Sequence, residues 1–223
     1  MPKIQLHEKY QDQARNICVF CYPDPFLILQ ETSNFILMFD PFSLVPGHLL
    51  MTSRTHYGCL GEVPLDLQQE GSELRQQAIS LLHHVFKNPV TRYEHGRAGH
   101  CLARDPSARS CHHYHEHLIP VPFSLHSSLV ASFKSIPYQV ESEVCGLYER
   151  YGEYLLVAES DEKKYFYIAK SKKVAPHLLR TLSAEALGYP ERQNWENYSS
   201  CTIMLEGKLR LEGVVNEVAC QQR

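Results

Sequence analysis

The spacing of apolar positions in the N-terminal half predicts strands followed by one long helix. Two apolar runs in "FLILQETSNFILMFD" flank the polar residues 31–34 and predict a hairpin, and a third strand is expected over 48–53. Residues 64–86 carry apolar side chains at helical spacing, with proline near the start and Asn-Pro just after the end. "VTRYEHG" predicts a fourth strand, closed by a glycine.

The pattern restarts in the C-terminal half. "EYLLVAES" and "KKYFYIAK" predict a second hairpin, and "APHLLRTLSAEALGY" predicts a helix that ends at Gly-Tyr-Pro. The tail that follows has weak helical periodicity. A serine-rich stretch separates the two strand-and-helix systems, so we expect one unit over 1–125 and a second over 126–223.

The run "SCHHYHEHLIPVP" at 110–122 places a histidine at every second position of a strand-like segment. In a regular strand His113, His115 and His117 share one face, while Glu116 lies on the other. Three adjacent imidazoles pack poorly against a core. Such a face therefore indicates a site for a metal or for a reactive anion.

Composition narrows the classes of function. The 223 residues are 43% hydrophobic and 21% charged, with a net charge of −3, so the chain lacks the basic footprint of a nucleic-acid binder. No apolar run approaches the ~20 residues of a membrane span, and the first residues carry no apolar signal segment. We therefore expect a cytoplasmic protein without a membrane partner. The eight cysteines then favour metal or redox chemistry over disulfides.

The motif "CVFC" offers two thiolates two residues apart, which a tight turn can direct toward one tetrahedral zinc ion. Cys18 and Cys21 then need two further ligands, for which His56 and His113 are the candidates. A redox pair is the alternative interpretation, but no strand–helix–strand context follows the motif. A second candidate metal site combines His100, Cys101, Cys111 and His112, although a regular strand would turn His112 away from His113.

Three motifs in order resemble the histidine triad (HIT) family. "HYHEHLI" resembles its His-φ-His-φ-His-φ-φ signature, where φ is apolar, except that Glu116 occupies a φ position. "CVFC" resembles the zinc knuckle of the zinc-containing branch, shared with galactose-1-phosphate uridylyltransferase, and "FDPFSLVPGHLLMTSRTHY" resembles the segment between them. The likeness covers residues 16 to 120. More loosely, "PHLLRTLSAEALG" and "WENY" resemble a bacterial subgroup with a C-terminal extension and CwfJ-like relatives.

The resemblance implies an α+β fold: a HIT-like antiparallel sheet of about five strands with the long helix 64–86 packed on it, and a smaller α/β C-terminal extension. It also implies a nucleotide as partner. Many HIT proteins pair through the long helix and the following strand, so a homodimer is possible; the extension could instead cover that surface.

The resemblance also assigns roles to residues. His115 matches the nucleophile that attacks the α-phosphorus, and His117 matches the histidine on the phosphate oxygens. His113 would complete a structural zinc site with Cys18, Cys21 and His56. The positions that match nucleotide-binding residues are Phe39, Asp40, His48, Glu94, Gly96 and Ser110.

The expected function is that of a HIT-type nucleotide hydrolase or nucleotidyl transferase with a covalent nucleotidyl-histidine intermediate. Dinucleoside polyphosphates, nucleoside phosphoramidates and nucleotide-sulfates are candidate substrates. A non-catalytic nucleotide- or RNA-binding module of the CwfJ-like type is the alternative, and a redox or zinc-storage protein is a third. The third leaves Asp40 and the Pro-Gly-His segment without a purpose.

Overall fold

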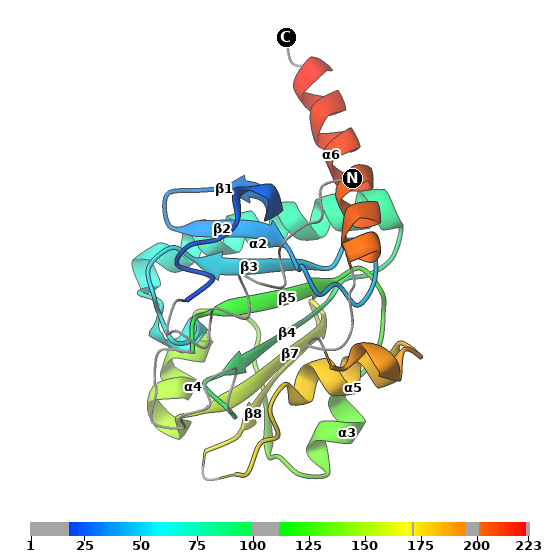
Figure 1. Ribbon diagram of the computed structural model, residues 1–223. Helices are drawn as coiled ribbons and strands as arrows, with labels where there is room; N and C mark the ends of the chain where they lie inside the picture. The colour runs from blue at the N-terminus through cyan, green and yellow to red at the C-terminus, as the bar shows by residue number, and fades with distance from the viewer. Residues whose placement is uncertain (1–17, 100–111, 171, 195–200, 222–223) are drawn as a thin grey trace.

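A computed structural model of the chain describes residues 18–99, 112–170, 172–194 and 201–221 (Figure 1). The strands are β1 Ile28–Glu31, β2 Phe35–Phe39, β3 Leu49–Ser53, β4 Thr91–Gly96, β5 His115–Ile119, β6 Ser135–Pro137, β7 Tyr154–Ser160 and β8 Lys163–Ile168. The helices are α2 Leu65–Phe86, α3 His126–Val130, α4 Glu143–Tyr151, α5 Leu178–Ala186 and α6 Cys201–Gln221, and the 3₁₀ turns are η2 Pro25–Leu27, η3 Leu60–Glu62 and η5 Pro190–Arg192.

The described strands form one antiparallel sheet in the order β1-β2-β3-β5-β4-β7-β8-β6 (Figure 1). The α+β class is confirmed, but this sheet of eight strands is larger than the expected five. The difference arises because β7 pairs along β4, so the strands of the C-terminal half continue the first sheet. The boundary at 125/126 stays a prediction, as does the homodimer. β4 has β5 on one side and β7 on the other, so its edges are not open to a second copy.

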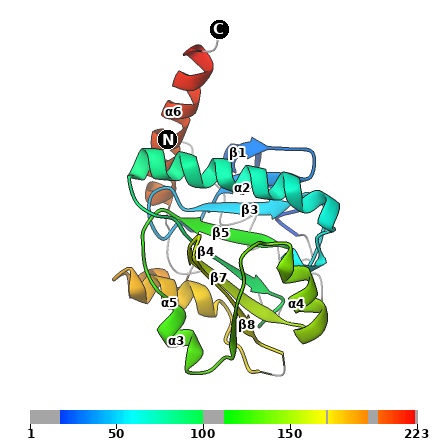
Figure 2. The ribbon, with the colours of Figure 1, turned by 180° about the vertical axis from the view of Figure 1, so that it is seen from behind.

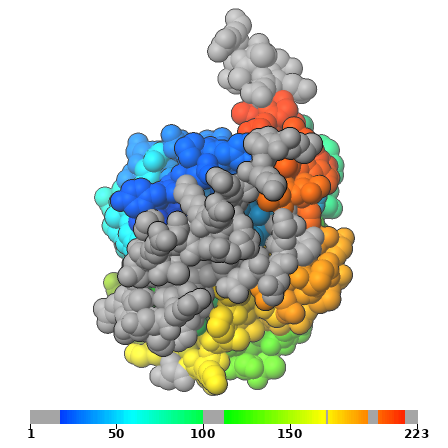
Figure 3. All heavy atoms as spheres, viewed as in Figure 1, coloured from blue at the N-terminus to red at the C-terminus, as the bar shows by residue number. Residues whose placement is uncertain are grey.

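Helices cover both faces of the sheet. The long helix α2, which matches the expected 64–86, lies on one face, and α5 lies on the other (Figures 1 and 2). Six residues of α2 recur at helical spacing and are buried: Gln68, Gly71, Leu74, Arg75, Ala78 and Leu82. In the space-filling view, α5 and α6 both reach the surface at one side of the molecule (Figure 3). No described helix is long and apolar enough to cross a membrane.

Beneath the histidine strand, a buried network of charges occupies the α2 side of the sheet. The Glu116 carboxylate accepts hydrogen bonds from Arg75 Nε at 2.6 Å and from Arg92 Nη1 at 2.7 Å. Arg92 continues to Glu141 at 3.1 Å, which Lys164 approaches at 3.4 Å. Two guanidinium groups thus compensate the charge of Glu116, which allows a glutamate at a position where the pattern has an apolar residue. The network also ties α2, β4 and β5 to the C-terminal half.

Replacing Glu116 with glutamine is expected to lower the free energy of unfolding by about 3–5 kcal/mol, because two buried arginines lose their shared counter-ion. Urea denaturation measures this effect. Glu31→Gln is the matched control: it breaks an ion pair with Arg54 in which both side chains are exposed, worth about 0–1 kcal/mol. Equal losses in the two variants would show that the buried network does not stabilise the sheet.

Candidate active site and metal centre

The histidine run is only partly a strand. β5 begins at His115, and His113 lies in the extended segment before it, where Tyr114 N–H donates to Tyr57 O at 2.7 Å. Alternation of the side chains nevertheless holds, because the Tyr114 hydroxyl accepts from Arg75 on the α2 side. The three imidazoles therefore leave the same face of the chain but take different partners.

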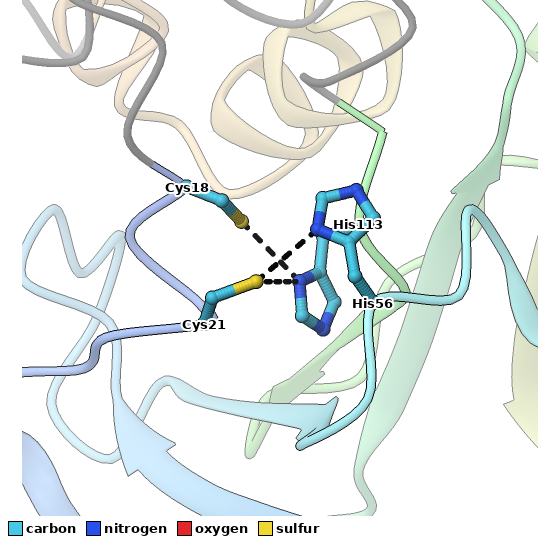
Figure 4. A group of neighbouring side chains, drawn as sticks. All are labelled: Cys18, Cys21, His56 and His113. Atoms are coloured by element: carbon cyan, nitrogen blue, oxygen red, sulfur yellow. Dashed lines mark hydrogen bonds between the residues drawn. The ribbon is translucent and has the colours of Figure 1, made fainter.

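His113 belongs to a cluster with Cys18, Cys21 and His56 (Figure 4). Its Nδ1 atom lies 3.3 Å from Cys18 Sγ and 3.5 Å from Cys21 Sγ, and His56 Nδ1 lies 3.2 Å from Cys21 Sγ. All four donor atoms lie within 4.8 Å of one another, a spacing that suits ligands around one tetrahedral ion with bonds of about 2.0–2.3 Å. The structure thus brings together the four residues predicted as ligands, and the cluster could bind a metal.

The second nitrogen of His113 supports this arrangement. Nε2 lies 2.7 Å from the carbonyl oxygen of Ser53 and donates its proton to it. The lone pair is then on Nδ1, which faces the sulfur atoms. Metal-bound histidines commonly donate their other N–H to such an acceptor.

Asp40, His48 and His117 form a second group whose donor atoms lie within 4.8 Å of one another. Here the second nitrogen argues against a metal. Leu44 N–H donates to His48 Nδ1 at 3.1 Å, so the proton of neutral His48 is on Nε2. That proton points to His117 Nδ1 at 2.9 Å. The group is therefore a chain of hydrogen bonds that places the proton of neutral His117 on Nε2.

Burial keeps this pair neutral. Burial lowers the pKa of His48 to about 4 and lowers the pKa of His117 well below its usual value. The Tyr93 ring also stacks on His117 with centroids 4.4 Å apart. The His117 ring is thus fixed in position and in tautomer, with Nε2–H as its available donor.

His115 has the opposite tautomer. Its Nδ1–H donates to the carbonyl oxygen of His113 at 2.8 Å, which leaves a lone pair on Nε2. Burial lowers the pKa of His115, so the ring is neutral at pH 7. Phe20 stacks on it at 4.5 Å and 21°. Our sequence reasoning missed Phe20, although its place inside "CVFC" was a signal: the turn that presents both sulfurs also carries this ring to His115.

The residues predicted to bind nucleotide do not all gather at the histidines. Asp40 and His48 lie on the histidine face, and Ser110 lies outside the described residues. Phe39 shares the face of β2 with Phe35, whose ring lies against Gly71 of α2, and the Lys208 ammonium of α6 approaches the Phe39 ring at 5.0 Å. Gly96 lies against the Tyr154 ring, which a Cβ there would meet at 2.2 Å. Phe39 and Gly96 are thus not brought to the triad.

Glu94 also lies on the α2 side of β4, because Tyr93, its neighbour in the strand, faces His117. Glu94 as a whole is 1% exposed, and its carboxyl group accepts from Leu60 N–H at 2.8 Å and from the Tyr154 hydroxyl at 3.0 Å. Burial raises its pKa to about 8.

Glu94 is expected to make stability depend on pH. Between its ordinary value of 4.5 and about 8, the folded protein holds a proton that the unfolded chain has released, so this group lowers stability as pH rises through that window. Glu94→Gln keeps a carbonyl acceptor and removes the titration. The free energy of unfolding is then measured by urea denaturation at about pH 5 and about pH 8. From the lower to the higher pH, it should fall less in Glu94→Gln than in the wild type. An unchanged loss would contradict this assignment.

The alternation in "YEHG" marks a further residue that we had not singled out. His95 lies on the same face as Tyr93, and its Nε2 accepts from Leu179 N–H, near the start of α5, at 3.2 Å. Burial lowers its pKa to about 3, so the ring is neutral with its proton on Nδ1. The histidine face thus contacts the C-terminal half directly.

Comparison with known proteins finds solved structures of HIT proteins. One, a hypothetical histidine triad nucleotide-binding protein from Sulfolobus tokodaii strain 7, is 21% identical over 47% of this chain and 68% of its own, with a TM-score of 0.36. HIT family proteins from Bacillus anthracis and Bacillus subtilis are 16% and 19% identical, each over 47% of this chain and 72% of theirs, with TM-scores of 0.37 and 0.38. No family model and no curated protein matches. Likeness at this level assigns no function, so any functional conclusion rests on the geometry of the histidine face.

Proposed function

We propose that the protein is a nucleotide hydrolase or nucleotidyl transferase that acts at an α-phosphate through a covalent intermediate on His115. The observation that carries this proposal is the hydrogen bond from His115 Nδ1 to the His113 carbonyl. It fixes a neutral imidazole with its lone pair on Nε2, which is the form of histidine that acts as a nucleophile.

In the proposed step, His115 Nε2 attacks the α-phosphorus, the bond from phosphorus to the leaving group breaks, and a nucleotidyl-histidine forms. Water or another acceptor then displaces the imidazole from phosphorus. His117 Nε2–H is the donor for a phosphate oxygen whose negative charge grows in the transition state. The tautomers of the two rings thus suit complementary tasks: a lone pair for attack and a proton for stabilisation.

We propose zinc as the ion of the Cys18, Cys21, His56 and His113 cluster. Two thiolates and two imidazoles are a donor set that zinc favours, and four protein ligands leave no position for a reactive water. The ion would thus be structural, holding the "CVFC" turn and His113 in place. A reducing, cytoplasmic compartment would keep the thiols available for it.

Mass spectrometry tests the covalent intermediate. The protein is incubated with a dinucleoside polyphosphate, a nucleoside phosphoramidate and a nucleotide-sulfate, quenched at alkaline pH, where phosphorus–nitrogen bonds persist, and digested. We expect a nucleotidyl group on the peptide that holds His115. His126→Ala, which removes an α3 histidine that stacks on Tyr165, should keep the adduct. Nucleotide binding without any adduct would favour the non-catalytic binding module.

A further inference from the structure

The C-terminal half contributes an arginine to the histidine face. Arg180 of α5 is 5% exposed, and its Nη2 donates to the carbonyl oxygens of Phe42 at 2.7 Å and Arg192 at 3.0 Å. Its Nη1 lies 3.7 Å from Asp40 Oδ2. The guanidinium therefore binds the loop that follows β2 and places a buried positive charge beside its aspartate.

Asp40 is the link between Arg180 and the imidazoles. Its Oδ1 accepts from Phe42 N–H at 2.7 Å, while Oδ2 lies 3.4 Å from His48 Nε2 and 3.7 Å from His117 Nδ1. The Asp40 side chain is 5% exposed, so its carboxylate is buried. A buried carboxylate without a counter-ion at this point would draw a proton into the imidazole pair.

We propose that Arg180 is a positioning residue of the histidine face: it holds the loop after β2, balances the charge of Asp40 and, together with burial, keeps His48 and His117 neutral in the tautomers that present His117 Nε2–H. Asp40 is then an electrostatic partner of the pair. The C-terminal half, through α5, completes the site. The effect of Arg180 on catalysis rests on the proposed function. Its effect on the protonation and tautomers of His48 and His117 does not.

The surroundings of the pair agree with this role. The titratable and charged groups that face it come from the end of β2 and from α5, β4 and β5: Asp40, Arg180, Tyr93, His95 and His115. Burial and Arg180 lower the pKa of both histidines, and Asp40 works in the opposite direction at His48. Arg180 and Asp40 are the charged members of this set, and their removal is the sharpest perturbation available.

Nitrogen-15 NMR of histidine-labelled protein measures the arrangement directly. In the wild type, His48 and His117 should show neutral rings with protonated Nε2 near neutral pH. In Arg180→Met, the titration midpoints of the pair should rise by about one pH unit or more. Arg180→Lys should restore them in part because the charge returns. Arg54→Met is the control: it removes an arginine that pairs with Glu31 and does not contact the histidine face, and it should leave both midpoints unchanged.

A background in which Asp40 is neutralised keeps the test valid if Arg180→Met alone does not fold. Asp40→Asn and the double variant Asp40→Asn/Arg180→Met can be compared even if Arg180→Met alone does not fold. Losing Arg180 in the Asp40→Asn background removes a repulsive charge, so the midpoints should rise again. Midpoints that do not move on loss of Arg180, in either background, overturn the proposal.

The rate of adduct formation gives the functional consequence. In Arg180→Met, adduct formation on His115 should slow about tenfold or more, while the nucleotide dissociation constant changes less, because the loss is in transition-state stabilisation. If the wild type forms no adduct, the proposed function fails and the NMR result still decides the role of Arg180. A normal adduct rate with shifted midpoints would overturn its catalytic consequence.

Discussion

If the cluster holds zinc as proposed, Cys18→Ser and Cys21→Ser are each expected to abolish metal binding and to unfold the N-terminal part of the protein. Zinc held by four side chains contributes about 10–16 kcal/mol in small zinc-binding peptides, as much as the whole stability of an ordinary domain. Here the ion would join the first described turn to the loop after β3 and to the segment before β5. Losing one thiolate therefore removes the connection among three separate parts of the chain.

Elemental analysis and thermal unfolding measure this effect. Wild-type protein should contain one zinc per chain and lose its cooperative transition in a strong chelator. Cys201→Ser is the matched control, since it replaces a half-buried cysteine in α6 that lies outside the cluster. If the Cys18 and Cys21 variants keep both the wild-type melting temperature and a full metal content, the proposed structural metal site is wrong.

Local patterns predicted local structure well. The hairpin of β1 and β2, the helix α2, the hairpin of β7 and β8, and α5 all follow from periodicity within their own residues. The pairing of β4 with β7 could not be predicted this way, because it joins segments far apart in the sequence. The short elements β6 and α4 lie between the two systems and were not predicted.

The candidate site also combines residues that local patterns predict with residues that only tertiary packing brings together. The four metal candidates could be named from the sequence because a Cys-x-x-Cys turn can direct two thiolates to one ion, and because His56 and His113 match the order of motifs in the family that the chain resembles. Phe39 and Glu94 depended on knowing which face of a strand each occupies, and a shift of one residue exchanges the faces. Arg180 carries no local signal at all: only the packing of α5 brings it to Asp40.

His115→Ala is expected to abolish turnover while leaving metal content and nucleotide affinity largely intact. The variant removes the proposed attacking nitrogen, but His117, His48 and Asp40 keep their mutual hydrogen bonds and contacts. His117→Ala should be less severe, on the order of a 10²–10³-fold loss in kcat, because it removes one donor to a developing anion. The two variants thus separate the proposed nucleophile from the residue proposed to stabilise the transition state.

Steady-state kinetics, nucleotide titration and adduct analysis on both variants measure the difference. The His115→Ala protein should form no adduct at any time, whereas His117→Ala should form it slowly and completely. Added imidazole should restore part of the turnover in His115→Gly, because it can occupy the space left by the ring and attack in its place. If His115→Ala retains turnover close to that of the wild type, covalent catalysis at this residue is wrong, and the histidine face is better understood as a nucleotide-binding surface.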